Sequence, residues 1–367
     1  MKQISVQISL QMARSVMSRY KPQEMRWHYE HGLVLQSIFL LGLNSGQEEL
    51  CSYVKTMYDT KITPQGDILT YRENEYNLDQ INPGKTLFLL HKKYGEEKYR
   101  IAIEKLMEQL RNHPRTKTEG FWHKQIYPWQ MWLDGLYMQG PFYAQYVSEY
   151  EPAAGFDDIV RQFTLVESKA RDSTTGLFYH AWDESGDQAW ANPQTGCSPH
   201  FWGRALGWYC MALVDTINFL PQPQYSEKLA VIACRLLEAL MKYQDDSGLW
   251  YQVMDRGGEP KNYTESSASS MFVYFLLKMI HLDLVPEKDI EWIKAAAVRA
   301  YKGLLENKLQ EDPAGELHLA GICSVAGLGG NPYRDGSYDY YVSEPVVSDD
   351  FKGVGPFILA SMEYEKL

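Results

Sequence analysis

The sequence predicts an all-α fold, namely a closed (α/α)6 barrel in which six helical hairpins form a toroid. Three observations predict it: a glycine-centred turn that recurs along the chain, a one-sided amphipathic segment before each turn, and a more apolar segment after it. The recurrence, at roughly 55–70 residues, fits one helical hairpin with a long loop. The turn glycines are Gly66, Gly120, Gly176, Gly248 and Gly315. We expect residues 1–367 to form one such domain.

The amphipathic segments are expected to be the outer helices. Their apolar residues recur at intervals of three and four and their charged residues lie on the opposite face, which is typical of helices with one buried side. The outer segments are residues 4–20, 47–59, 96–113, 156–172, 226–244 and 289–308. The segments after each loop, for example 31–42 and 353–364, are poorer in charge and richer in glycine, alanine and aromatic residues. Such helices are buried on most sides, so we expect them to form the inner ring.

Inner helices of such a ring run parallel, so the loops that lead into them meet at one end of the barrel. These loops are long, and long irregular loops in compact proteins are usually functional. They also contain most of the tryptophans. Aromatic faces, imidazoles and carboxylates together are suited to sugars, whose C–H faces stack on rings and whose hydroxyls need hydrogen bonds. The expected funnel residues are Trp27, His28, Tyr29, Asp79, Trp122, His123, Lys124, Trp129, Trp132, Asp134, His180, Trp182, Trp202 and Arg204.

One carboxylate, Asp134, lies in the aromatic stretch YPWQMWLDGLYMQGP, residues 127–141. Burying an unpaired charge among such side chains is costly, so this residue should have a partner or a chemical role. A structural alternative is that Asp134 caps a helix starting at Gly135 by accepting backbone N–H groups. Asp79, in NLDQINPG, has the same alternative as the cap of the second inner helix.

Composition restricts the partners. A net charge of −11 and a pI near 5.4 argue against nucleic acid and against an anionic membrane surface, since both favour basic patches. No run approaches the ~20 apolar residues of a membrane helix, and the first residues lack the apolar core of a signal peptide, so we expect a cytoplasmic protein. The 5 cysteines are scattered and should be reduced. Cys197, His200 and Cys323 remain an alternative zinc set.

A set of motifs then resembles a known family. The motifs are RWHYEHG, GFWHK, YPWQMWLDGLYM, GLFYHAWD, GCSPHFWGRALGW and GLWYQVMD, and they extend from about residue 24 to the C-terminal YDYYVS. Together they resemble the unsaturated rhamnogalacturonyl hydrolases of glycoside hydrolase family 105. The resemblance implies a catalytic (α/α)6 barrel that acts, without cofactor or metal, on a small saccharide, 4,5-unsaturated galacturonyl-rhamnose, produced from pectin by a lyase.

The resemblance also implies roles for single residues. The family's general acid/base falls on Asp134, which would deliver a proton to C4 of the vinyl ether; water adds at C5, and the hemiketal opens and releases rhamnose. Substrate-contacting positions of the family fall on Tyr29, Asp79, His123, His180, Trp202 and Arg204. We add Trp132, the aromatic neighbour of Asp134. Whether Asp79 also takes part in catalysis stays open, as does the role of Lys124, which either adds positive charge or lies solvated at the rim.

Three alternatives remain at this point. The related unsaturated glucuronyl hydrolases share the barrel but act on glycosaminoglycan-derived disaccharides. An ordinary glycosidase would use Asp79 and Asp134 as its carboxylate pair. A toroid that only binds saccharide or zinc is the third alternative, because a fold does not fix a function.

Overall fold

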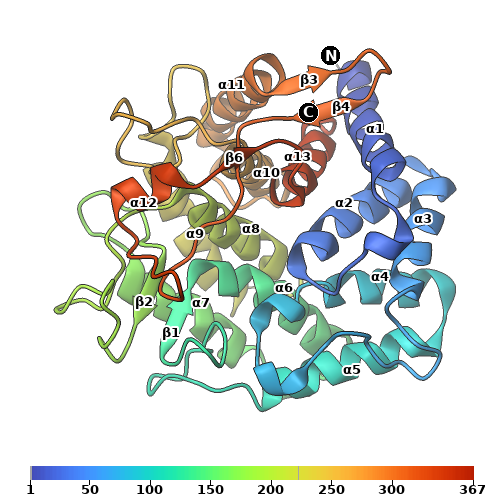
Figure 1. Ribbon diagram of the computed structural model, residues 1–367, viewed down its shortest axis with the longest axis horizontal. Helices are drawn as coiled ribbons and strands as arrows, with labels where there is room; N and C mark the ends of the chain where they lie inside the picture. The colour runs from blue at the N-terminus through green and yellow to red at the C-terminus, as the bar shows by residue number, and fades with distance from the viewer. Residues whose placement is uncertain (1, 222) are drawn as a thin grey trace.

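The computed structural model describes residues 2–221 and 223–367, and its helices form an (α/α)6 barrel (Figure 1). The inner helices are α2 (Tyr29–Ser45), α4 (Gly84–Tyr94), α6 (Leu133–Tyr150), α8 (Gly203–Ile217), α10 (Ser266–His281) and α13 (Phe351–Tyr364). The outer helices are α1 (Lys2–Arg19), α3 (Glu48–Asp59), α5 (Glu97–Arg111), α7 (Asp157–Ala170), α9 (Ser226–Met241) and α11 (Ile290–Asn307). The predicted fold class and the assignment of segments to the two rings are confirmed.

The inner ring closes on itself. Each inner helix contacts the next in the order α2, α4, α6, α8, α10, α13, and α13 contacts α2. Glycines allow these helices to approach closely: a Cβ on Gly207 of α8 would lie 2.6 Å from Sδ of Met271 on α10. The inner helices run parallel, so their N-terminal ends share one end of the barrel. We call this end, together with the loops entering it, the loop end.

All the turn glycines except Gly120 have a positive φ, a backbone conformation that favours glycine. Gly248 has a φ of +86°, and a Cβ there would lie 2.7 Å from the carbonyl oxygen of Arg299, so both conformation and space exclude a side chain. At the second turn the positive φ, 73°, belongs to Glu119 and not to Gly120. At Gly120 a side chain is excluded by lack of room, because a Cβ there would collide with Sδ of Met131.

Short strands join the long loops, which the sequence pattern did not predict. β1 (Gln130–Trp132) pairs antiparallel with β2 (Ala181–Asp183), and β5 (Ile322–Cys323) pairs with β6 (Val346–Val347). β3 (Leu309–Glu311) and β4 (Leu317–Leu319) form a hairpin after α11. A short helix, α12 (Tyr338–Ser343), precedes β6. Runs of two or three residues carry no period of their own, so only the pairing of distant loops reveals them.

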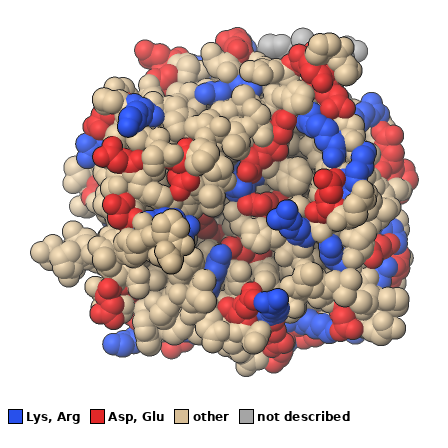
Figure 2. All heavy atoms as spheres, viewed as in Figure 1, with Lys and Arg blue, Asp and Glu red and all other residues tan. Residues whose placement is uncertain are grey.

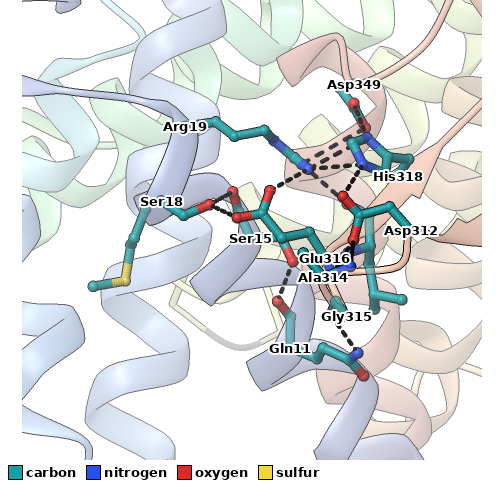
Figure 3. A network of polar contacts seen from close by, with 12 residues as sticks. Gln11, Ser15, Ser18, Arg19, Asp312, Ala314, Gly315, Glu316, His318 and Asp349 are labelled. Carbon is teal, nitrogen blue, oxygen red and sulfur yellow. Dashed lines mark hydrogen bonds and ion pairs between the residues drawn. The ribbon is translucent and has the colours of Figure 1, made fainter.

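Polar contacts tie the N-terminal helix to the β3–β4 hairpin, which closes the outer ring beside α13 (Figure 3). The guanidinium of Arg19 donates to Oε2 of Glu316 at 3.2 Å and to the carbonyl of Leu317 at 3.0 Å. Nδ1 of His318 lies 2.6 Å from Oδ2 of Asp349, in the loop that leads to α13. The N-terminal segment is thereby held to the C-terminal third of the chain.

Acidic and basic side chains are interspersed over the face shown in Figure 2. Exposed ion pairs on the protein surface include that of Arg14 with Glu49 at 2.8 Å. Among the described residues, no helix is both long enough and apolar enough to cross a lipid bilayer.

Candidate active site

The predicted site residues come together at the loop end of the barrel. Tyr29 begins α2, Asp134 is the second residue of α6, and Arg204 is the second residue of α8. Asp79 lies in the 3-10 turn Leu78–Gln80, shortly before α4. The others lie in the connecting loops or directly before a helix: His123, Trp132, His180 and Trp202. The β1–β2 pairing aligns Trp132 with Ala181, which places His180 beside the start of α6.

A continuous aromatic surface runs through these loops. Trp132 stacks on His123 at a centroid distance of 4.7 Å and an angle of 8°, and on Tyr127 at 5.0 Å and 13°. His180 meets the edge of Trp132 at 5.2 Å and lies 4.8 Å from Trp202. Aromatic rings of this kind can stack on the C–H faces of a sugar, and imidazole nitrogens can hydrogen-bond its hydroxyls.

Asp134 is neither a helix cap nor an ion-paired surface residue. α6 begins at Leu133, its N-cap residue is Trp132, and no side chain caps it. The alternative that Asp134 caps a helix starting at Gly135 is therefore wrong. Oδ2 of Asp134 is buried without a hydrogen-bond partner, and the nearest basic nitrogen is Nε2 of His180 at 3.3 Å. A carboxyl oxygen left unpartnered in a buried position is available to a ligand.

Asp79 is held in a different environment. Its Oδ2 lies 2.5 Å from Nζ of Lys124, and its Oδ1 lies 3.6 Å from Nε2 of His123. Burial alone would raise the pKa of Asp79, but the charges of Lys124, His123 and His28 outweigh it and lower the pKa to about 2. Asp79 is therefore ionised at neutral pH. Its side chain caps neither its own turn, which Asn77 caps, nor α4, so the capping alternative is wrong here too.

The imidazole of His123 and the phenol of Tyr29, which lie near these carboxylates, are neutral at physiological pH. Burial lowers the pKa of His123 to about 4, although the charge of Asp79 opposes this. Burial likewise raises the pKa of Tyr29, which is further raised by Glu30 and Asp79. A neutral imidazole or phenol can hydrogen-bond a sugar hydroxyl without adding a charge to the site.

Arg204 is fully buried, with its guanidinium 4.9 Å from the ring centre of Trp202. Its Nη1 donates to the carbonyl of Cys323 at 2.5 Å, while its Nε has no hydrogen-bond partner. Arg204 thus links α8 to the β5 segment through this hydrogen bond, and its buried Nε–H remains without an acceptor. The structure shows a structural contact for this residue in addition to the substrate contact that the resemblance implies.

Two residues of the site were not assigned from the sequence. Lys124 is not a solvated rim residue, because it forms the ion pair with Asp79. Tyr341, on α12, is fully buried, and its hydroxyl lies 2.8 Å from Nδ1 of His180. It fixes the imidazole whose other nitrogen faces Asp134. The motif YDYYVS was the available signal, but nothing in a single sequence relates it to a residue 161 positions earlier.

The structure gives the zinc alternative no support. Sγ of Cys197 donates to the carbonyl of Lys169 at 3.1 Å. Within the described part of the chain, the one group with ligand-like spacing is Asp312, Glu316 and His318, which includes no cysteine. The guanidinium of Arg19 already binds this group (Figure 3).

Comparisons with known proteins agree with the fold and show the family. The sequence model of the family described as Glycosyl Hydrolase Family 88 matches residues 3–367. A solved family 105 glycoside hydrolase from C. acetobutylicum ATCC 824 is 47% identical and superposes with a TM-score of 0.94, over 98% of this chain and 99% of that one. The unsaturated rhamnogalacturonyl hydrolase YesR of Bacillus subtilis is 26% identical over 262 residues, which are 70% of this chain and 71% of YesR.

Two further relatives are less informative about function. The protein Atu3128 of Agrobacterium fabrum is 43% identical over 225 residues, covering 61% of this chain and 96% of Atu3128. An unsaturated glucuronyl hydrolase specific for heparin superposes with a TM-score of 0.74 at 14% identity, over 100% of this chain and 97% of that one, and so shows the shared fold alone.

The fold, together with the family model that matches residues 3–367, places the chain among the glycoside hydrolases. Within that class, the chain belongs to the family described as Glycosyl Hydrolase Family 88, with the family 105 resemblance confirmed by its structural relative.

Proposed function

We propose that the protein hydrolyses 4,5-unsaturated galacturonyl-rhamnose, a disaccharide that a lyase releases during pectin degradation. The observation that carries the proposal is the contrast between the carboxylates: Asp79 is ion-paired with Lys124 at 2.5 Å, whereas Oδ2 of Asp134 is buried and unpartnered. One group stays an anion, and the other is free to exchange a proton with the substrate. The name of the relative YesR supports the substrate.

In the proposed reaction, Asp134 acts as general acid and then as general base. Its carboxyl proton goes to C4 of the vinyl ether, and positive charge develops at C5 and the ring oxygen. The resulting carboxylate takes a proton from the water that adds at C5. The hemiketal then opens by cleavage of the bond between C5 and the ring oxygen, which gives a ketone at C5 and a hemiacetal at C1. The hemiacetal breaks its C1–O bond to rhamnose and becomes an aldehyde, so that one water is consumed for each glycosidic bond cleaved.

The remaining residues bind and orient in this proposal. Asp79 accepts hydrogen bonds from sugar hydroxyls or from the attacking water, and Lys124 keeps it ionised. Trp132 and Trp202 offer stacking faces for sugar rings. His123 and Tyr29 hydrogen-bond hydroxyls, and the free Nε of Arg204 donates to the substrate. His180 lies against Asp134, where it contacts the same sugar ring.

A cytoplasmic location is part of the proposal. The five cysteines are all unpaired in the structure, and four of them are buried. Reduced thiols are typical of proteins that work in a reducing compartment.

The first experiment is a spectroscopic assay. Unsaturated galacturonyl-rhamnose made by a lyase should lose the ultraviolet absorbance of its C4=C5 bond on incubation with the protein, and saturated galacturonyl-rhamnose should remain intact. In heavy water the product should carry deuterium at C4. Equal turnover of the saturated sugar would reject hydration in favour of an ordinary glycosidase. Faster turnover of an unsaturated glycosaminoglycan disaccharide would reject the pectin-derived substrate.

A matched pair of variants tests the role of Asp134. Asp134→Asn keeps the shape of the side chain but cannot exchange the proton, so kcat should fall by about 10²–10⁴ while substrate still binds. Asp187→Asn, in an exposed loop, removes a charge of the same sign and should leave kcat unchanged. Near-normal turnover by Asp134→Asn would show that another group supplies the proton.

A further inference from the structure

A second cavity lies at the opposite end of the barrel from the candidate active site. It has a volume of about 330 Å³ and is lined by residues from all the inner helices, α2, α4, α6, α8, α10 and α13. Its lining residues Asn218 and Lys278 lie at the C-terminal ends of α8 and α10. None of the predicted site residues lines it. We call it the axial cavity.

Stacked aromatic rings separate the axial cavity from the loop end. Tyr29 meets Trp208 edge-on at 5.9 Å, and Trp208 stacks on Tyr137 at 5.0 Å and 23°. On the side of Tyr137 nearer the cavity, Nζ of Lys85 lies 3.6 Å from the ring centre. A ligand in the axial cavity would therefore not occupy the saccharide site.

Lys85 is the reason to expect a ligand. Its side chain lines the cavity yet is only 2% exposed, and Nζ has no hydrogen-bond partner among the described residues. An ammonium buried without acceptor oxygens is strongly unfavourable, and the ring of Tyr137 replaces only part of its hydration. Burial lowers the pKa of Lys85 to about 7, against the opposing charge of Asp215. At neutral pH the group is thus still partly charged and lacks an acceptor.

The cavity lining carries three lysines and two carboxylates, and so a formal positive excess. Glu363, whose charge also reaches Asp215, does not line the cavity and is paired with Lys366 and His281. Asp215 accepts a hydrogen bond from Tyr274 at 2.6 Å, and neither it nor any other described residue hydrogen-bonds Nζ of Lys85. Lys278, which is only partly buried, is a second cation near the same carboxylate. The buried Lys85 and the partly buried Lys278 therefore lie near one aspartate. At the rim, Lys92 and Glu149 offset each other.

We propose that the axial cavity is a second ligand site that binds a small oxyanion through Lys85 and Lys278. A phosphate or carboxylate would supply the acceptor oxygens that Nζ of Lys85 lacks and would neutralise the excess charge. The amide of Asn218, which also lines the cavity, can donate to the remaining oxygens. Nε2 of Gln145 already donates to Glu149 at 2.8 Å and has one further N–H to offer. The volume is at the lower end of the range for small-molecule pockets, so the ligand is a single small molecule.

The test is a binding titration with two probes, inorganic phosphate and galacturonate, at constant ionic strength in sodium chloride. The variants are Lys85→Met, and Lys93→Met as the control, since the exposed Lys93 is the α4 lysine that pairs with Glu48 outside the cavity. Isothermal titration calorimetry should show one site per chain for at least one probe. Affinity should fall at least tenfold in Lys85→Met and stay unchanged in Lys93→Met. The probe that binds shows whether the ligand of the axial cavity carries a phosphate or a sugar carboxylate.

Several outcomes would overturn the proposal. Binding of neither probe would show that water fills the cavity. Equal binding of galacturonate by the wild type and by Lys85→Met would place that ligand in the saccharide site. Methionine replaces a buried unpaired charge with an apolar chain of similar length, so Lys85→Met should fold and be at least as stable as the wild type. If it does not fold, Lys278→Met, which is nearer the surface, must show the same loss of binding.

Discussion

Replacing Lys124 by methionine removes the cation that holds Asp79 ionised while keeping the length of the side chain. In the wild type, Nζ of Lys124 lies 2.5 Å from Oδ2 of Asp79, and the side chain of Asp79 is 6% exposed. The variant leaves that carboxylate buried beside His123, whose Nε2 is 3.6 Å away, and His28, whose Nε2 is 3.9 Å away. Burial lowers the pKa of both histidines, so neither replaces the lysine at neutral pH.

The magnitude follows from the pKa of Asp79. Lowering it from 3.8 to about 2 means that ionisation of this group stabilises the wild type by about 2 kcal/mol. That contribution is fully present above pH ~4 and is lost as the pH falls through about 2. Without Lys124, burial raises the pKa of Asp79 above its usual range, so folding becomes more favourable as the pH falls and the carboxylate is protonated. Breaking a buried pair in this way costs about 3–5 kcal/mol at neutral pH.

The assay is urea unfolding followed by tryptophan fluorescence between pH 4 and pH 7. Lys124→Met should be less stable than the wild type at pH 7, and the difference should shrink by at least 1 kcal/mol towards pH ~4. Lys117→Met, an exposed lysine of the same loop, should show no such trend. The acid limb of the pH dependence of kcat/KM should move upwards by about one pH unit or more in Lys124→Met. A stability difference that is constant with pH would refute the assignment of Asp79 as the group that Lys124 holds ionised.

Three further variants test positioning, packing and ring closure. Tyr341→Phe leaves Nδ1 of His180 buried without a partner and should lower kcat about tenfold with little change in KM, measured by steady-state kinetics; an unchanged kcat would show that the hydroxyl does not orient the imidazole. Gly207→Ala would place a Cβ 2.6 Å from Sδ of Met271 and should destabilise the protein by about 1–3 kcal/mol, seen as a lower Tm; an unchanged Tm would show that α8 and α10 can move apart. Arg19→Met should cost at most about 1 kcal/mol in urea unfolding, because its side chain is 30% exposed; a much larger loss would mean that the network of Figure 3 is needed to close the ring.

The local patterns of the sequence determined the helices and their order in the barrel. A helix buried on one side and a helix buried on most sides leave different periodicities, and both depend only on residues within three or four positions of one another. The ring followed because each amphipathic segment alternates with an apolar one. The same local reasoning drew attention to Asp134, because a carboxylate in the aromatic stretch 127–141 stands out from its neighbours; its catalytic role stays a prediction.

Tertiary structure alone decided the environment of each carboxylate. Whether Asp79 or Asp134 served as a helix cap could not be determined from sequence, because a capping aspartate and an aspartate in the first helical turn are preceded by similar residues. The β1–β2 pairing, the ion pair of Lys124 with Asp79, and the contact of Tyr341 with His180 all join different loops. Such contacts leave no local period in the sequence, because they depend on how the closed ring brings the ends of distant helices to the same place.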